Sequence, residues 1–253
     1  MRFKKKQSVL TVVTQTLFFG FFIFNFFLEP SFADTSSQNA SFMRGKAVYE
    51  RYCIGCHGVQ GNGRGAYAAG LNPPPRDFTA GIFKWTGGQA GSLPSDTDLL
   101  MTITEGTHGT AMPSWQALRE ADRLDVIQYI KSFSNRFKEE VLSPELFIYP
   151  APPITQSAVE EGKLLFEKMG CSTCHGVNGR GDGPSSHTLI DDWGNPILPA
   201  NFSKGIFKTG QENWKIYRSV TNGVGGTPMP SFSEQLKPTE IWAVVYYIRS
   251  LKE

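Results

Sequence analysis

Apolar residues recur at helical spacing in several segments of the chain. Residues 158–169 carry apolar or small side chains at positions i, i+4, i+7, i+8 and i+11, which lie on one face of a helix. A second stripe lies in residues 241–248, after Pro238, which suits the first turn of a helix. Ser95 and Asp98 have the spacing of a capping box, so a further helix is expected to begin there. The segments between are rich in Gly and Pro and show little strand alternation, so an all-α protein is predicted.

All four cysteines fall in two copies of one pattern. The phrase CIGCH at residues 53–57 is matched by CSTCH at residues 171–175, 118 residues later. The flanking phrases match as well: GKAVYERY with GKLLFEKM, PRDFTAGIFK with PANFSKGIFK, and GTAMPSW with GTPMPSF. Because their order is kept, the chain is predicted to be a tandem of two small helical domains of about 100 residues each.

The predicted domains are residues 34–136 and residues 157–253, with a linker at residues 137–156. Four prolines deny this linker regular helix. Its residues 147–149, Phe-Ile-Tyr, are too apolar to be left in water. We therefore expect the linker to lie along a domain face and to hold the two domains in a fixed relation.

Residues 1–33 have the layout of a secretory signal peptide. Four basic residues precede an apolar run at residues 9–28, and Ser31-Phe32-Ala33 offers a small-x-small site for cleavage after Ala33. An uncleaved anchor is the alternative, because a run of about 20 residues can span a bilayer. Cleavage would remove four Lys/Arg and one Glu and lower the formal charge from +2 to −1, which gives no general attraction to nucleic acid. We expect a periplasmic protein whose membrane contact, if any, is N-terminal.

The motif Cys-x-x-Cys-His admits four interpretations. A structural zinc site needs four ligands, usually in two spaced pairs, and each copy has one cysteine pair. A disulfide closing so small a loop would stabilise little and would leave His57 and His175 without a role. A redox dithiol is expected in a βαβ context, which the pattern does not predict. Covalent attachment of haem uses both thiols and the histidine.

With these residues in place, each copy resembles a class I cytochrome c, and residues 41–253 resemble a tandem two-haem member of that family. The family's N-terminal helix has a Gly and an aromatic residue four positions later, and its terminal helix has an apolar residue and an aromatic residue three positions later. The resemblance implies two covalently bound haem c groups, each enclosed by a few helices. The matching pairs are Gly45 with Tyr49, Gly162 with Phe166, Val126 with Tyr129, and Val244 with Tyr247.

The resemblance also implies which residues hold the haems. Two cysteines of each copy would form thioether bonds, and a His and a late-loop Met would be the axial ligands of iron. His108, on the same loop as Met112, is the rival ligand, but its counterpart is Gly225. His187 lies in an insertion of the second copy and is expected at the surface. The haem-binding residues are Cys53, Cys56, Cys171 and Cys174, and the iron ligands are His57, Met112, His175 and Met229.

Further residues are expected around the haems. A haem-ligating His normally donates its second ring N–H to a carbonyl. The resemblance implies that the carbonyls of Pro75 and Pro199 could be the acceptors, and the alternative is that both are plain turn prolines. Lys84, Lys208 and Arg76 could meet the haem propionates, or they could be solvated.

Iron with His and Met ligands has no open position, so each site is expected to change charge by one electron without binding a substrate. We expect an electron carrier, not an enzyme, that connects a dehydrogenase or quinol-oxidising complex with an oxidase or reductase. The alternatives are an electron-transfer subunit of a larger molybdenum-type oxidoreductase and a dihaem peroxidase, which would need one haem able to open. A thiosulfate-oxidising cytochrome would need a cysteine ligand, and no cysteine remains outside the two motifs.

Overall fold

The computed structural model describes residues 32–253, so the expected signal peptide lies almost wholly outside the described residues. Helices provide the regular structure of this part, in which the one strand-like feature is an isolated bridge between Ile190 and Pro196. The all-α prediction is confirmed. None of the described helices is both long enough and apolar enough to cross a lipid bilayer.

The helices divide between the two halves of the chain. The first half contains α1 (Phe32–Tyr52), α2 (Ile54–His57), α3 (Asp96–Glu105), α4 (Glu120–Lys131) and α5 (Arg136–Glu139). The second half contains α6 (Gln156–Lys168), α7 (Cys171–His175), η1 (Ser186–Thr188), η2 (Phe202–Lys204), α8 (Asn213–Asn222) and α9 (Pro238–Ser250).

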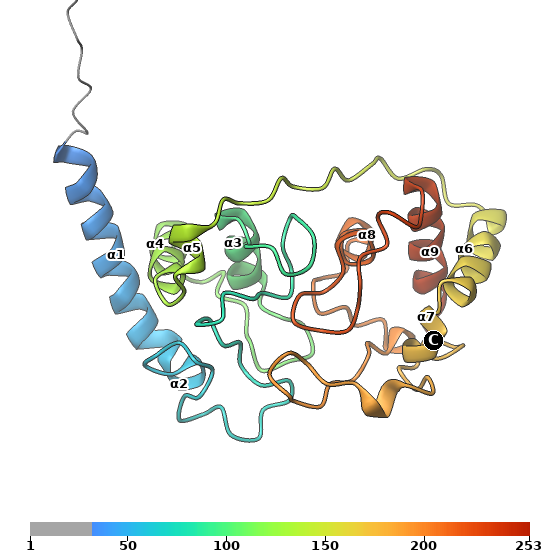
Figure 1. The fold of residues 1–253 in the computed structure, drawn as a ribbon, viewed down its shortest axis with the longest axis horizontal. Coiled ribbons are helices and arrows are strands. Elements are labelled where there is room, and N and C mark those ends of the chain that lie inside the picture. The colour runs from blue at the N-terminus through green and yellow to red at the C-terminus, as the bar shows by residue number, and fades with distance from the viewer. Residues whose placement is uncertain (1–31) are drawn as a thin grey trace, which may run out of the picture.

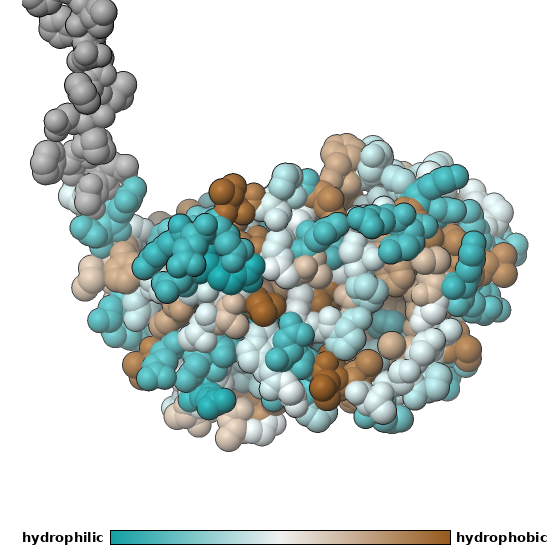
Figure 2. Space-filling model, viewed as in Figure 1, coloured by the Kyte–Doolittle hydropathy of each residue, from teal (hydrophilic) through white to brown (hydrophobic). Residues whose placement is uncertain are grey.

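The two halves lie side by side, and an extended segment joins α5 to α6 along one edge of the molecule (Figure 1). The N-terminal part of α1 projects away from the body. The face drawn in Figure 2 is mostly hydrophilic, with small separate apolar patches. The large apolar side chains gather in two clusters, one in each half.

Each half is built on a crossing of its first and last long helices. A Cβ atom on Gly45 of α1 would lie 2.0 Å from the carbonyl oxygen of Asp125 on α4, and one on Gly162 of α6 would lie 2.0 Å from that of Ala243 on α9. Only glycine allows the backbones to approach so closely. The two glycines that the family resemblance singled out thus lie at the crossings. The aromatic residues named with them pack beside them, with Phe166 5.4 Å from Tyr247 between ring centroids.

The extended segment, residues 140–155, is tied to both halves. The Leu146 amide donates to the carbonyl of Gly87 in the first half at 2.8 Å. The indole of Trp242 on α9 donates to the carbonyl of Tyr149 at 2.9 Å. Ile148 packs against the core of the second half, whereas its neighbours Phe147 and Tyr149 stay exposed. The expectation that all three apolar residues lie against a face is therefore correct for Ile148 only, because an extended chain turns adjacent side chains to opposite sides.

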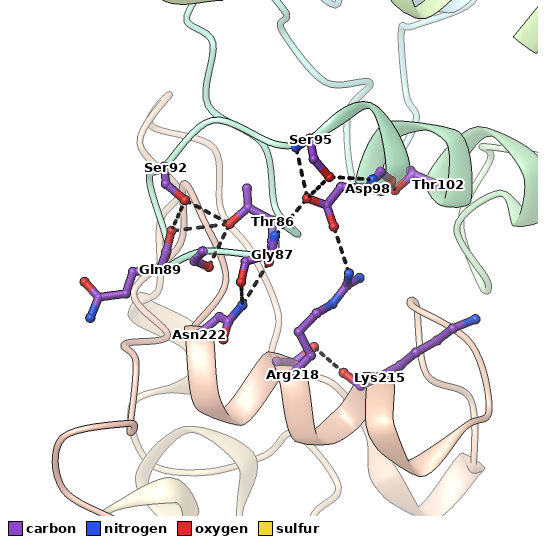
Figure 3. A network of polar contacts seen from close by, with 12 residues as sticks. Thr86, Gly87, Gln89, Ser92, Ser95, Asp98, Thr102, Lys215, Arg218 and Asn222 are labelled. Atoms are coloured by element: carbon purple, nitrogen blue, oxygen red, sulfur yellow. Dashed lines mark hydrogen bonds and ion pairs between the residues drawn. The ribbon is translucent and has the colours of Figure 1, made fainter. Parts of the chain in front are cut away.

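The contact between the halves joins helices α3 and α8, which occupy the same place in the two repeats (Figure 3). Asp98 on α3 accepts a hydrogen bond from Nη1 of Arg218 on α8 at 2.9 Å, and both side chains are nearly excluded from solvent. Lys215 on α8 is buried, and its Nζ lies 2.5 Å from Oε2 of Glu105 on α3. Asp98 and Lys215 are equivalent in the repeat, each 14 residues before its Met-Pro pair. Because these equivalent positions carry opposite charges, Asp98 of α3 pairs with Arg218 of α8, and Lys215 of α8 pairs with Glu105 of α3.

The loops beside this contact follow an approximate two-fold relation. The His108 amide donates to the carbonyl of Lys208 at 3.1 Å, and the Gly225 amide donates to the carbonyl of Lys84 at 3.0 Å. His108 is equivalent to Gly225, and Lys84 is equivalent to Lys208, so each half makes the same contact on the other. A Cβ atom on Gly225 would lie only 2.1 Å from the carbonyl oxygen of Phe83. This steric limit explains why the second copy cannot carry the histidine of the first.

Candidate functional site

The Cys-x-x-Cys-His motif folds into a single helical turn in each half. In the first, the His57 amide donates to the carbonyl of Cys53 at 2.9 Å, and Gly58 ends the turn with a φ of 80°. The hydroxyl of Tyr49, on α1, holds this end by donating to the carbonyl of Gly58 at 2.7 Å. One turn of helix thus brings Cys53, Cys56 and His57 to the lining of one cleft.

Each motif histidine is fixed by a carbonyl and an aromatic ring. Nδ1 of His57 lies 3.0 Å from the carbonyl oxygen of Arg76, and its ring stacks on Phe78 at 4.4 Å between centroids. In the second half, Nδ1 of His175 lies 3.2 Å from the carbonyl oxygen of Ala200, and the ring stacks on Phe202 at 4.6 Å. A carbonyl can only accept, so Nδ1 carries the proton and Nε2 keeps the lone pair that an iron ligand needs.

The carbonyls of Pro75 and Pro199 do not accept from the histidines. In each half the acceptor is the carbonyl of the next residue, Arg76 or Ala200. The proline carbonyls face the glycine-rich turns instead: a Cβ atom on Gly63 would lie 2.5 Å from the oxygen of Pro75, and one on Gly181 would lie 2.8 Å from that of Pro199. Successive carbonyls of an extended segment point in different directions, so the next residue serves the histidine. The GNGRG and GRGDG phrases are thus close-packing turns.

Burial shifts the pKa values of several motif residues. Burial lowers the pKa of His57 and of His175, so both imidazoles are neutral and able to act as ligands. Burial raises the pKa of Cys53 to about 12 and that of Cys171 to about 11. A redox dithiol needs a cysteine with a lowered pKa, and these thiols have the opposite shift. This argues against the dithiol interpretation.

The zinc and disulfide interpretations also lack support. The described residues contain no group of three or more His, Cys, Asp or Glu side chains placed to hold a metal ion. The two cysteine pairs therefore do not meet in a shared zinc site. All four cysteines are free thiols in this structure.

The cleft of the first half has a volume of about 1370 Å³, including its open mouth, and its walls are mainly apolar. Met112 lines it together with the motif residues. The backbone of Met112 is held by two hydrogen bonds: its amide donates to Oγ1 of Thr110 at 3.1 Å, and its carbonyl accepts from the Thr107 amide at 3.0 Å. His108, in contrast, is exposed and is not part of this lining. Apolar walls come from Val48, Phe83, Leu99, Ile103, Trp115, Val126 and Ile130.

The second half repeats this arrangement. The Met229 amide lies 3.3 Å from Oγ1 of Thr227, and the Val224 amide donates to the Met229 carbonyl at 3.1 Å. Cys171 and Met229 both pack against the apolar cluster of this half, so the thiol and thioether lie on the same core. His187 is exposed, as expected.

The residues present fit a haem. One cleft offers two thiols, a neutral imidazole and a thioether among apolar walls, and three cationic residues in its lining could pair with the haem propionates. These cations are Arg76, Lys84 and Lys208, the last contributed by the second half. Burial lowers the pKa of Lys84 to about 8, with further lowering by the nearby charges of Arg76 and Lys208. A cluster of crowded, partly buried cations is the setting in which bound carboxylates are most stabilising.

Four contacts at the haem sites were not predicted from the sequence. The carbonyls of Arg76 and Ala200 hold the histidines, Trp193 stacks on Arg76 with the guanidinium carbon 4.2 Å from the ring centroid, and Lys208 reaches the cleft of the other half. The one available signal was the match between PRDF and PANF, which placed Arg76 and Ala200 at equivalent positions without showing which carbonyl faces the ring.

Comparison with known proteins agrees with two similar haem domains. The cytochrome c family model matches residues 159–252, and the model described as cytochrome c oxidase, cbb3-type, subunit III matches residues 40–130. The chain is 27% identical over 215 residues to the cbb3-type cytochrome c oxidase subunit FixP of Azorhizobium caulinodans, and 25% identical over 218 residues to the corresponding subunit CcoP of Helicobacter pylori. Each of these alignments covers 82% of the chain but only 58% of the relative.

A solved structure matches over more of its own length. A chain of the reducing HAO-like protein complex of Kuenenia stuttgartiensis superimposes with a TM-score of 0.81 and 40% sequence identity. The match covers 83% of the present chain and 96% of the Kuenenia chain.

Proposed function

Since this chain belongs to the c-type cytochromes, as a tandem of two cytochrome c domains with one covalently bound haem c each, we propose that it carries single electrons through two His/Met-ligated haems. The observation that carries the proposal is the shared lining of one cleft by Cys53, Cys56, His57 and Met112. In the second half, Cys171, Cys174, His175 and Met229 take the same roles.

The chain's own residues make the sites suited to electron transfer. The carbonyls of Arg76 and Ala200 fix the proton on Nδ1 of each histidine and so direct Nε2 to the metal. The apolar walls exclude water, and the Met loops are held by their neighbouring threonines. A bound haem supplies a one-electron change of iron charge, and a thioether ligand favours the ferrous state. His57 with Met112, and His175 with Met229, would hold the two irons and leave no position for a substrate, so we propose a carrier and not an enzyme.

We further propose that the chain works as an electron-transfer subunit docked in a larger redox complex. The 96% coverage of a chain from an HAO-like protein complex supports this, because nearly the whole relative is matched. We therefore propose an HAO-like protein as the partner, in place of the molybdenum-type oxidoreductase that the sequence analysis named as one alternative. A second candidate partner is a cbb3-type oxidase, which the match of residues 40–130 favours. In either case the haem domains would face the periplasm, with residues 1–33 as the export signal or anchor.

A binding and oxidation experiment separates the two partners. The ferrous protein is mixed with a purified HAO-like protein or with a cbb3-type oxidase, and complex formation and haem oxidation are followed by gel filtration and stopped-flow absorbance. The proposal predicts a stable complex and fast oxidation with the HAO-like protein in the presence of its substrate. Fast oxidation by the oxidase alone would favour the second candidate, and no oxidation by either would contradict both.

Carbon monoxide tests the closed coordination separately. Six-coordinate iron in both halves predicts slow or partial binding to the ferrous protein at neutral pH. Rapid stoichiometric binding at either haem would indicate an open site and restore the peroxidase alternative.

A further inference from the structure

A segment of the second half is longer than its counterpart and reaches across to the first half. His57 and Pro75 are 18 residues apart, whereas His175 and Pro199 are 24 residues apart. The six additional residues lie in the loop at residues 185–198. Its Trp193 ring lies over the guanidinium of Arg76, with the guanidinium carbon 4.2 Å from the ring centroid.

The loop is held in shape, so the position of Trp193 is fixed. Oδ1 of Asp191 accepts hydrogen bonds from the amides of Trp193 at 3.0 Å and Asn195 at 2.8 Å. The isolated bridge between Ile190 and Pro196 closes the loop at its base. The Asp192 amide donates to the carbonyl of Gly226 at 3.2 Å, which ties the loop to the Met229 segment of its own half.

Arg76 connects this loop to the first haem site in two ways. Its carbonyl accepts the hydrogen bond from Nδ1 of His57, and its side chain lines the cleft that contains Met112. The equivalent residue in the second half is Ala200, whose carbonyl does the same for His175. The hydrogen bond from this backbone carbonyl is therefore common to both halves, but only the first half has a positively charged side chain at this position.

We infer that Trp193 of the second half is a positioning residue that raises the reduction potential of the first haem by holding the Arg76 guanidinium at its cleft. A positive charge near the iron disfavours the ferric state, and the effect is strong only where the charge is shielded from water. Stacking on an aromatic face keeps the guanidinium there instead of in solvent. Asp77, Asp191 and Asp192 lie near enough to offset part of this charge.

The inference rests on the proposed ligation of the first haem and predicts a specific pattern of potentials. Each haem is titrated potentiometrically in the intact chain, and the first haem is identified by the band it loses in Met112→Ala. Trp193→Ala should lower the ferrous-to-ferric ratio of the first haem about tenfold at a fixed potential. This corresponds to a fall of ~59 mV in its one-electron reduction potential, and the potential of the second haem should not change. Trp193→Phe should keep the wild-type value, because a phenyl face still stacks on the guanidinium.

Arg76→Ala provides the decisive control. It installs the residue that the second half carries and retains the backbone carbonyl, so the haem should stay bound while its potential falls by a similar amount. In this background Trp193→Ala should have no further effect. Additive shifts, equal shifts at both haems, or no shift in Arg76→Ala would overturn the inference, even if Trp193→Ala alone proves too unstable to titrate. A wild-type first haem without His/Met spectra would instead contradict the proposed function.

Discussion

Asp98 and Arg218, from opposite halves of the chain, form a hydrogen-bonded ion pair of 2.9 Å that is almost fully removed from solvent. Oδ2 of Asp98 also accepts from the amides of Gly87 at 2.8 Å and Ser95 at 3.0 Å. One carboxylate therefore caps α3, anchors the loop before it and joins the two halves. Because it lies between the two haem domains, it fixes their relative placement.

Asp98→Asn should therefore destabilise the protein strongly. Removing one partner of a buried ion pair leaves the other charge uncompensated, at a cost of about 3–5 kcal/mol in the free energy of unfolding. Urea unfolding followed by circular dichroism measures this. Asp122→Asn is the matched control, since its partner Arg119 is largely exposed, and it should change stability little. Equal effects of the two substitutions would show that the Asp98 pair is not structural.

Gly225→Ala should disturb the contact between the two halves beside Phe83 and lower the stability of the protein. The added methyl would lie 2.1 Å from the carbonyl oxygen of Phe83, and overpacking of this kind costs about 1–3 kcal/mol. His108→Ala, at the equivalent position of the first half, removes only an exposed side chain and should stay within about 0.5 kcal/mol of wild type. Thermal unfolding of both variants checks the prediction. A tolerated Gly225→Ala would mean that the two halves do not pack as closely as in this structure.

The crossing of α1 and α4 should weaken in acid. Burial alone would raise the pKa of Asp125, but hydrogen bonds from Arg44 and Ser41 outweigh it and hold the pKa below its ordinary value of 3.8. A depressed folded-state pKa gives stability that is present above the unfolded value and is lost as the pH falls through the folded value. Asp125→Asn should thus reduce stability at pH 6 and approach wild type as the pH falls through the lowered folded-state pKa of Asp125. A difference between the two proteins that is independent of pH would exclude this role for the carboxylate.

Local and repeated signals made much of the fold predictable. Gly45 and Gly162 stand at matched positions because backbone contact at each crossing excludes any side chain, and Ser95 with Asp98 marks the start of α3. Contacts between the halves were not predictable, because they depend on how two independent domains are placed. Trp193 and Arg76 are 117 residues apart and share no pattern. The reversal of charge between the equivalent Asp98 and Lys215 was visible in the sequence, but only the structure shows that both face the other half.

Haem attachment through the second motif can be tested independently of ligation. Cys171→Ala combined with Cys174→Ala should halve the covalently bound iron, measured after acid-acetone extraction, because each motif attaches one haem. The second half should also lose order, since Cys171 and Met229 pack on its apolar cluster and a haem would complete that core. Serine at both positions serves as a second variant of similar size. Two covalent haems in either variant would refute the assignment of this motif.

The most direct test of the account is the red charge-transfer band of the ferric protein, which a thioether ligand gives and a second imidazole does not. Met112 lines the first cleft and His108 is exposed outside it. The account predicts the band for both haems in the native protein, its reduction by about half in Met112→Ala together with a lowered potential of the first haem, and an unchanged band in His108→Ala. A native band of only half this intensity, from the second haem alone, that Met112→Ala leaves unchanged would show that the first haem is ligated by two histidines and would contradict the account.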